Sequence, residues 1–250
     1  GMVLQAGQGL MSSAVARILP TEYRPWWAQR MFHRSRAPIR VVVAGRQSGK
    51  SHMLSEEVKD IMLRRPGTTS LLLMPTYRST KGMLSHLRRA FKPLEGRYKW
   101  KEFDKYFELY NQSRLYLRTD DASGVPSRGL TIDGVYAVDE AGFISADAHT
   151  AARLTQAAVT NPGPLCIVTT TPNGRGNWVY KEWLAGQPGP DKDPSIDSFR
   201  FRSTDSPYCN AEFVRTLRER IGAQRAMQEL DAQFTGDASA AFSPDAIDAL

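Results

Sequence analysis

Apolar residues along this chain are grouped in short runs that alternate with helical patterns. A run at 41–43 leads through a glycine-bearing turn into residues 51–65, whose apolar positions recur at helical spacing. A second run at 70–74 precedes another expected helix at 78–91, which ends ahead of Pro93. This alternation predicts an α/β fold with a mainly parallel central sheet flanked by helices.

Three later segments extend the predicted sheet. Residues 103–118 hold two aromatic-rich runs around Asn111-Gln112 and predict a hairpin inserted into the sheet. The runs at 135–138 and 165–169 end in polar residues. Such runs are typical of central parallel strands, whose carboxyl ends hold the functional site.

The last quarter of the chain has a different pattern. Residues 185–195 are rich in Gly and Pro and predict an exposed loop, whereas 211–234 are helical in pattern and predict a small subdomain. We therefore expect an N-terminal extension at 1–20, a core at 21–203 and a lid or linker subdomain at 204–250.

Composition narrows the class of protein. The 33 Lys and Arg outnumber the 26 Asp and Glu, giving a formal charge of +7, which favours an anionic partner such as nucleic acid or acidic lipid. With only Cys166 and Cys209, neither a disulfide framework nor a zinc site is expected, and a reducing, intracellular compartment fits. No run of about 18 apolar residues occurs, so no membrane association is expected. Gly1 before Met2 is expected to be a cleavage scar.

The turn after the first strand has the pattern of a phosphate-binding loop. The N-terminus of a helix offers unpaired N–H groups and the positive end of a dipole, which suit a polyphosphate. Gly49 lets the backbone approach the phosphates, Lys50 can reach the β and γ oxygens, and the Ser51 hydroxyl can ligate Mg²⁺. Arg46 and Gln47 could contact phosphate or be solvated. The predicted nucleotide-binding set from this turn is Gly45, Arg46, Gln47, Ser48, Gly49, Lys50, Ser51 and His52.

An acidic pair supplies what such a loop lacks. Asp139 and Glu140 follow the apolar run at 135–138, where they would face the loop. We predict that Asp139 holds Mg²⁺ and that Glu140 is the general base or positions the attacking water. By itself, an apolar run ending in Asp-Glu is more often a solvated turn, and the preceding loop makes the functional interpretation the better one.

Two further segments are candidates for contact with the nucleotide. Thr170 lies in a hydroxyl cluster at 169–171, which could sense the γ-phosphate. The same residues could equally be a β-branched strand end closed by a Pro-Asn-Gly turn. Gln29 follows Trp26-Trp27 and could recognise adenine, although tryptophans at helical positions are more often packed core.

Taken in order, these features resemble the ATPase domain of the large terminase subunit, the DNA-packaging motor of tailed bacteriophages. The resemblance spans about residues 22–242. It rests on the segment ending at Gln29, Arg46-Gln47-Ser48-Gly49-Lys50-Ser51, Met74-Pro75-Thr76-Tyr77, Ser127-Arg128-Gly129, Asp139-Glu140, Thr170-Thr171-Pro172 with Gly174, Asp205-Ser206-Pro207-Tyr208, and Gln228-Glu229-Leu230 with Phe234.

The resemblance implies a P-loop NTPase of the additional-strand, catalytic-glutamate type, assembled as a homo-oligomeric ring around double-stranded DNA. ATP and Mg²⁺ are then the expected substrate and cofactor. Arg128 is the candidate arginine finger acting in trans, although without the resemblance it would be an ordinary surface arginine. A portal protein and a small terminase subunit are the further partners implied, and the infected host's cytoplasm, transiently at the procapsid portal, is the implied location. The family's nuclease domain is not expected in this chain, and neither is nuclease activity.

DNA contact is expected from backbone-directed cations, since a translocating motor must ignore base sequence. A solvated helix face is the alternative for any one of these residues. A helicase-like ATPase and a non-hydrolysing P-loop module remain alternatives to the motor. The candidates for DNA contact are Arg78, Lys81, Arg88, Arg89, Lys92, Arg97, Lys99, Lys101 and Lys105.

Overall fold

The computed structural model describes residues 23–120, 126–161 and 163–236. The predicted extension at 1–20, with its cleavage scar, and residues 237–250 of the predicted lid lie outside the described residues. The helices are α2 (Trp27–Arg34), α3 (Lys50–Arg64), α4 (Tyr77–Phe91), α5 (Ala146–Leu154), α6 (Trp178–Ala185), α7 (Ala211–Ile221) and α8 (Ala223–Glu229). The strands are β1 (Ile39–Ala44), β2 (Thr69–Met74), β3 (Tyr98–Lys101), β4 (Tyr106–Leu109), β5 (Arg114–Thr119), β6 (Tyr136–Val138), β7 (Cys166–Thr170) and β8 (Ile196–Phe201). Three 3₁₀ turns are η1 (Lys92–Leu94), η2 (Ala141–Phe143) and η3 (Ser203–Asp205).

The strands form one sheet in the order β3-β4-β5-β2-β6-β7-β1-β8. Every pairing from β5 to β8 is parallel, whereas β3 and β4 pair antiparallel. The strand β7 lies between β1, which precedes the P-loop, and β6, which precedes Asp139. This inserted strand confirms the additional-strand topology, and the mainly parallel α/β sheet is confirmed with it.

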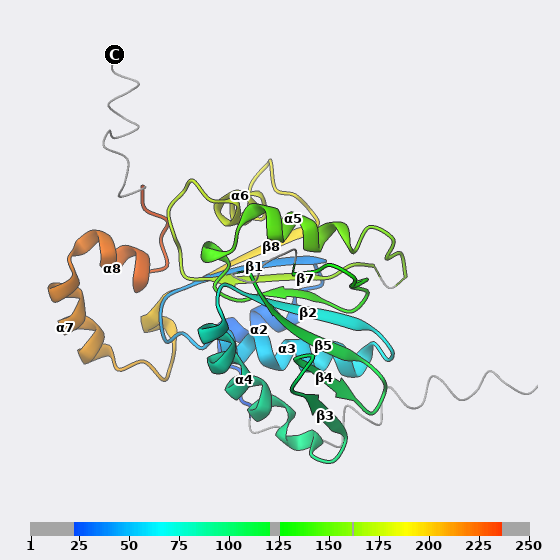
Figure 1. The fold of residues 1–250 in the computed structure, drawn as a ribbon. Helices are drawn as coiled ribbons and strands as arrows, with labels where there is room; N and C mark the ends of the chain where they lie inside the picture. Colours follow the sequence, from blue (N-terminus) through cyan, green and yellow to red (C-terminus); the bar gives the residue numbers. More distant parts are fainter. Residues whose placement is uncertain (1–22, 121–125, 162, 237–250) are drawn as a thin grey trace, which may run out of the picture.

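Helices cover both faces of the sheet, with α2, α3 and α4 on one side and α5 and α6 on the other (Figure 1). Alternate residues of β1 divide between these layers: Val42 and Ala44 belong to the core on the α3 side, and Val41 to the core on the α5 side. Period-2 burial on both faces makes the central strands continuously apolar, which is why the sequence located them.

Two strands were missed and one prediction needs correction. The sequence predicted neither β3, whose exposed lysines interrupt its pattern, nor β8, which contains Asp197, Ser198 and Arg200. The hairpin predicted at 103–118 is confirmed as β4 and β5, but it extends the sheet beyond β2 and does not separate existing strands.

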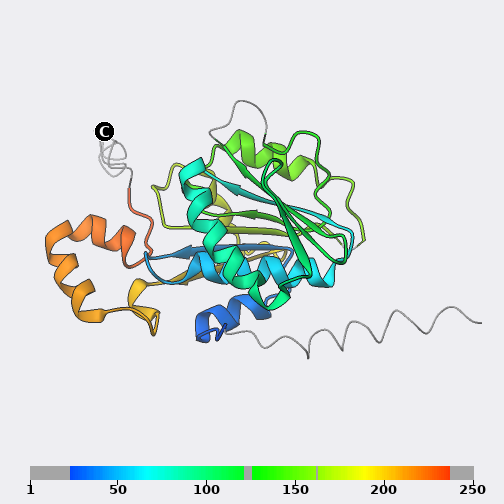
Figure 2. The ribbon, with the colours of Figure 1, turned by 60° about the horizontal axis from the view of Figure 1, so that its bottom comes forward.

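The helical segment predicted at 211–234 is two helices, because Gly222 adopts φ +81° between them, and helix ends at Glu229. This α7–α8 pair falls in the predicted lid, a role that stays a prediction, and is called the lid below. It stands beside the sheet at the end of β1 from which the P-loop leaves (Figures 1 and 2). Ala232 and Phe234 then return to the core, where they join Val43. Part of the 204–250 range therefore packs on the core.

Candidate nucleotide site

The P-loop links the buried carboxyl end of β1 to the first turn of α3. Gly49 is the N-cap of α3 in the left-handed conformation at φ +84°, and Gln47 has φ +60° although it carries a side chain. Non-glycine residues adopt this region at an energetic cost and mostly where function requires it. The Ser48 hydroxyl is buried and has no hydrogen-bond partner among the described residues. The loop therefore presents the strained backbone and unsatisfied polar group expected of a ligand cradle.

The acidic pair meets the loop as predicted from the sequence. The Ser51 hydroxyl donates to Asp139 Oδ2 at 2.8 Å, and the Thr169 hydroxyl donates to Asp139 Oδ1 at 2.7 Å. Burial raises the pKa of Asp139, an effect that the Lys50 charge opposes and Glu140 reinforces. A divalent cation beside Ser51 would favour the ionised form of this carboxyl.

Lys50 is held between two motifs. Its Nζ lies 3.0 Å from Glu140 Oε1 and donates to Thr171 Oγ1 at 3.2 Å. Glu140 itself has φ +53°, the left-handed region again, and η2 begins directly after it. The candidate base and the candidate phosphate-binding lysine therefore neutralise each other.

The segment after β7 supports the turn that carries Glu140. The Gly142 N–H donates to Thr170 Oγ1 at 3.0 Å, and Asn173 Nδ2 donates to the Gly142 carbonyl at 2.9 Å. The Thr170 hydroxyl donates to the Thr171 carbonyl at 2.7 Å, whereas the hydroxyl that accepts from the lysine belongs to Thr171. The sequence singled out Thr170 for nucleotide contact, which stays a prediction, and did not separate it from Thr171.

The beginning of the P-loop is joined to the lid. A Cβ on Gly45 would lie 2.5 Å from the Leu230 carbonyl oxygen and 2.6 Å from Ser203 Oγ, so only glycine fits here. Arg46 donates from its backbone to the Glu229 carbonyl at 2.8 Å and from Nε to the Glu229 carboxylate at 2.5 Å. Sequence reasoning gave no role to Ser203, and Glu229 entered only with the family resemblance. No local pattern marks partners 157 and 183 residues from Arg46.

Three other predicted residues lie around this centre. Gln29 is buried and donates to the Gly49 carbonyl at 3.3 Å, so it supports the loop from behind. His52 is half-buried, with its ring edge-on to Tyr23 and parallel to that of His86. Arg128 is exposed in the turn at 126–129, followed by Gly129 at φ +78°. Their roles toward nucleotide stay predictions.

Within the described parts of the chain, no three His, Cys, Asp or Glu side chains gather into a metal site. A cation at Ser51 and Asp139 would thus take its other ligands from phosphate oxygens and water, as Mg²⁺ does in nucleotide sites. None of the described helices combines the length and apolar character needed to cross a bilayer.

Comparison with known proteins identifies the family. The family described as "Terminase large subunit, T4likevirus-type, N-terminal" matches residues 41–248. The chain belongs to the terminase large subunit family. The terminase large subunit of Thermus virus P23-45 is 27% identical to this chain over the matched region. That region covers 88% of this chain and 51% of the relative. The chain thus spans about half the length of the terminase subunits it matches.

Solved terminase structures place the match in one domain. The ATPase domain of the Thermus phage P74-26 large terminase has a TM-score of 0.73 and 25% identity, with 86% of this chain and 96% of that chain covered. The chain therefore corresponds to the ATPase domain of a large terminase. The bacteriophage HK97 large terminase shares the fold at TM-score 0.71 and 13% identity, over 87% of this chain and 53% of its own. A large terminase of a thermophilic bacteriophage, solved in complex with ADP, shares it at TM-score 0.69 and 15% identity, over 84% of this chain and 53% of its own.

Proposed function

We propose that this domain hydrolyses ATP in a Mg²⁺-dependent reaction and that hydrolysis drives double-stranded DNA into a phage capsid. The observation that carries the proposal is the convergence of Lys50, Glu140 and the Ser51–Asp139 pair at the carboxyl edge of one parallel sheet. These are the groups that phosphoanhydride hydrolysis needs: a phosphate cradle, a cation site and a base.

Each residue has a distinct task in this proposal. The backbone of residues 45–50 binds the triphosphate, with Lys50 on its β and γ oxygens and Gln29 toward adenine. Ser51 and Asp139 hold Mg²⁺, which neutralises charge on the phosphates. The Glu140 carboxylate orients the attacking water and accepts its proton.

The Lys50–Glu140 ion pair keeps both side chains occupied until a phosphate binds Lys50. While Lys50 Nζ lies 3.0 Å from Glu140 Oε1, the carboxylate is occupied by the lysine and the lysine is not directed to phosphate. Phosphate oxygens compete for Lys50 and release Glu140. Thr170 and Asn173 hold the turn next to Glu140, so the same change reaches the segment after β7.

DNA contact is proposed for the basic residues of α4, η1 and β3 and of the segments that flank β3. Eight of the nine sequence candidates are exposed, and Lys105, which is half-buried, places its Nζ 4.1 Å from the Tyr77 ring centroid. Exposed cations without base-specific geometry suit a motor that follows the phosphate backbone.

The proposal includes assembly. We infer that the domain assembles into a homo-oligomeric ring in which Arg128 of one subunit completes the nucleotide site of its neighbour. The ring is seated on a portal protein in the host cytoplasm, and a small terminase subunit is a further partner. An exposed arginine followed by a positive-φ glycine supports this role, because the side chain extends from a tight turn into solvent.

Replacing the proposed base tests the function. Glu140→Gln should lower kcat for ATP hydrolysis by at least about 100-fold, since proton transfer is lost, while ATP binding persists. Hydrolysis is measured as phosphate release at saturating ATP with and without duplex DNA, and binding with a fluorescent analogue. Glu219→Gln, on the exposed face of α7, is the control and should leave kcat unchanged. Equal kcat values for Glu140→Gln and wild type would refute the assignment.

A further inference from the structure

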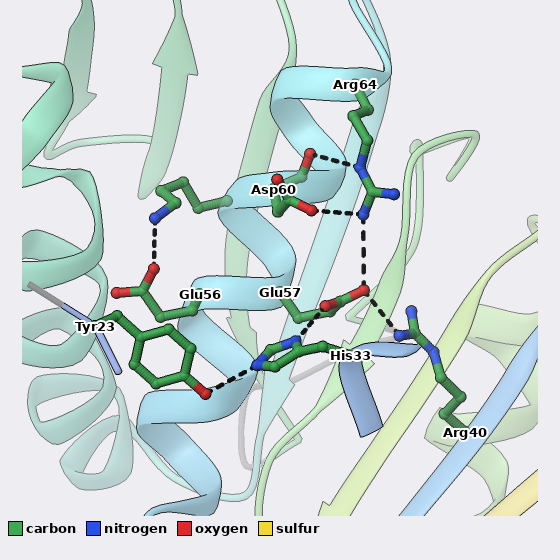
Figure 3. A network of polar contacts seen from close by, with 8 residues as sticks. Tyr23, His33, Arg40, Glu56, Glu57, Asp60 and Arg64 are labelled. Carbon is green, nitrogen blue, oxygen red and sulfur yellow. Dashed lines mark hydrogen bonds and ion pairs between the residues drawn. The ribbon is translucent and has the colours of Figure 1, made fainter. Parts of the chain in front are cut away.

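A second polar cluster surrounds the opposite end of α3 from the P-loop (Figure 3). Glu57 accepts from Arg40 Nη1 at 2.8 Å and pairs with His33 Nδ1 at 2.6 Å, while Tyr23 bonds the other nitrogen of His33 at 2.8 Å. Arg64 reaches Glu57 at 3.8 Å and Asp60 at 2.7 Å. Since α3 rises about 1.5 Å per residue, Arg64 lies roughly 20 Å from the P-loop. The Arg64 end of the cluster is therefore distant from the P-loop, whereas at its other end Tyr23 packs against His52.

This cluster borders a cavity of about 300 Å³ between the end of α2, the start of β1 and the last turns of α3. Four arginines line it, Arg36, Arg40, Arg64 and Arg65, against the single lining carboxylate of Glu57. Ile61 and Leu165 form an apolar part of the wall, which strengthens electrostatic interactions inside. The cavity is thus strongly cationic and suited to an anion.

The carboxylates already present neutralise only part of this charge, since Arg64 pairs with Asp60 and Arg40 pairs with Glu57. Glu57 is shared among Arg40, His33 and Arg64. Arg36 and Arg65 have no carboxylate within ion-pair distance in the described part of the chain, and Arg65 donates to the carbonyls of Asp133, Gly134 and Gly163. Burial and the neighbouring Arg64 lower the pKa of Arg65, as expected for a poorly compensated cation.

One buried donor in the cavity wall is unused. Arg40 is only 4% exposed, and its Nε–H finds no hydrogen-bond partner among the described residues. Buried donors are nearly always satisfied, so an unpaired guanidinium N–H points to an acceptor that is absent from the chain itself. Arg36 and Arg64 are exposed at the rim, which leaves the cavity open to a ligand.

We propose that this cavity, the Arg36–Arg65 pocket, binds a phosphate group. Guanidinium groups bind phosphate oxygens through paired N–H donors, and several of them together can match the charge of a phosphate dianion. The group comes either from a DNA backbone or from free phosphate. The DNA source rests on the proposed function, whereas the free-phosphate source does not.

The test removes the two rim charges together, in Arg36→Ala/Arg64→Ala. The matched control is Arg220→Ala/Arg225→Ala, which removes two exposed lid arginines with no ion pair among the described residues. All measurements use a non-hydrolysable ATP analogue to saturate the P-loop. Equilibrium dialysis measures binding of labelled orthophosphate, and fluorescence anisotropy measures duplex DNA affinity across a series of salt concentrations. Thermal melting shows whether each variant is folded.

Wild type and control should bind one orthophosphate in the pocket, and the rim variant should lose at least about tenfold in affinity. If DNA is the source, the slope of log K against log salt should also fall by about 2 in the rim variant alone. A change confined to orthophosphate identifies free phosphate. If neither ligand distinguishes rim variant from control, the proposal is wrong and a carboxylate ligand becomes the alternative. ATP hydrolysis is not measured here, so this failure would leave the proposed function intact.

Discussion

At the scale of single residues, the candidate site holds two of the five non-glycine residues with positive φ in the described part of the chain. Gln47, Gly49 and Glu140 all have positive φ within the two loops that face each other across β7. Such strain persists only where the surroundings enforce it, and it fixes the direction of the backbone N–H groups and of the Glu140 carboxylate. The surrounding fold thus fixes the backbone of both loops.

At Gly45 a single added methyl group would meet both backbone and side-chain atoms. Gly45→Ala places Cβ against the Leu230 carbonyl and Ser203 Oγ, so we expect a loss of about 1–3 kcal/mol in the free energy of unfolding and a displaced lid. Gly82→Ala is the matched control, because no atom lies within 4 Å of its Cβ. In the middle of α4 it should stabilise by about 1 kcal/mol. Chemical denaturation measures both, and equal effects would contradict the packing argument.

At the scale of elements, α3 is the link between the molecule's two polar centres. Its first turn carries Lys50 and Ser51, and its later turns carry Glu57 and Arg64, which fasten α2 and β1 to it through His33 and Arg40. Charged groups at these buried positions are stable only when paired. The helix is thereby fixed in register against β1.

The Glu57 cluster should control acid stability. Burial alone would raise the pKa of Glu57, but the bond from His33 and the charges of Arg40 and His33 outweigh it and hold the pKa below its usual range. This stabilisation is complete above the unfolded-state pKa of about 4.3 and is lost as pH falls through the lower folded-state pKa. Glu57→Gln should therefore lower the free energy of unfolding by about 3 kcal/mol at pH 7. It should also make the free energy of unfolding less dependent on pH below about pH 4.

Urea denaturation between pH 2 and pH 7 measures this dependence. Glu95→Gln, at an exposed position, is the control and should follow the wild-type curve. If Glu57→Gln kept the wild-type slope below pH 4, the cluster would not be the source of acid lability.

At the scale of the whole molecule, the lid contacts the nucleotide site through the first residues of the P-loop. The Ser203 hydroxyl donates to the Arg46 carbonyl at 2.6 Å and the Ser203 N–H donates to the Leu230 carbonyl at 2.7 Å. These bonds join the P-loop, η3 and the residue that follows α8. Because the Arg46 side chain is largely exposed, its pair with Glu229 is weak enough to be exchanged for phosphate.

Removing the lid's carboxylate should therefore favour nucleotide. In Glu229→Gln, Arg46 loses a competitor for phosphate, and KM for ATP should fall about two- to fivefold, the range of an exposed ion pair. Glu212→Gln on α7 is the control, since that exposed residue pairs with Arg215 within the same helix. Steady-state kinetics measure KM. An unchanged or higher KM in Glu229→Gln would show that Arg46 does not exchange partners.

Assembly provides the last prediction. If Arg128 acts in trans, wild-type hydrolysis per chain should rise with protein concentration, and Arg128→Ala should be slower by about 1,000-fold at any concentration. Mixing Arg128→Ala with Glu140→Gln should restore activity, because each Glu140→Gln chain offers Arg128 to a neighbour whose base is intact. Absence of rescue, with hydrolysis independent of concentration, would remove the trans role.

The sequence by itself determined the strands of the central sheet, the P-loop and the Asp139-Glu140 pair. Buried parallel strands are continuously apolar, and phosphate-binding loops need glycine, lysine and hydroxyl residues at fixed spacing. Both features can therefore be predicted from short stretches of sequence. It missed β3 and β8, whose polar residues conceal the strand pattern, and it extended one helix through Gly222.

Only the tertiary structure decided which distant groups meet. Thr171 accepts a hydrogen bond from Lys50, and Glu229 pairs with Arg46. Arg36 and Arg65 line one cavity with Arg40. No local sequence pattern around these residues predicts these contacts. Strand order determines these contacts, because the parallel crossovers bring the carboxyl ends of β1, β6 and β7 to one edge of the sheet. The Arg36–Arg65 pocket lies at the opposite edge, where β1 begins. Contacts across more than a hundred residues follow from that topology and not from local spacing.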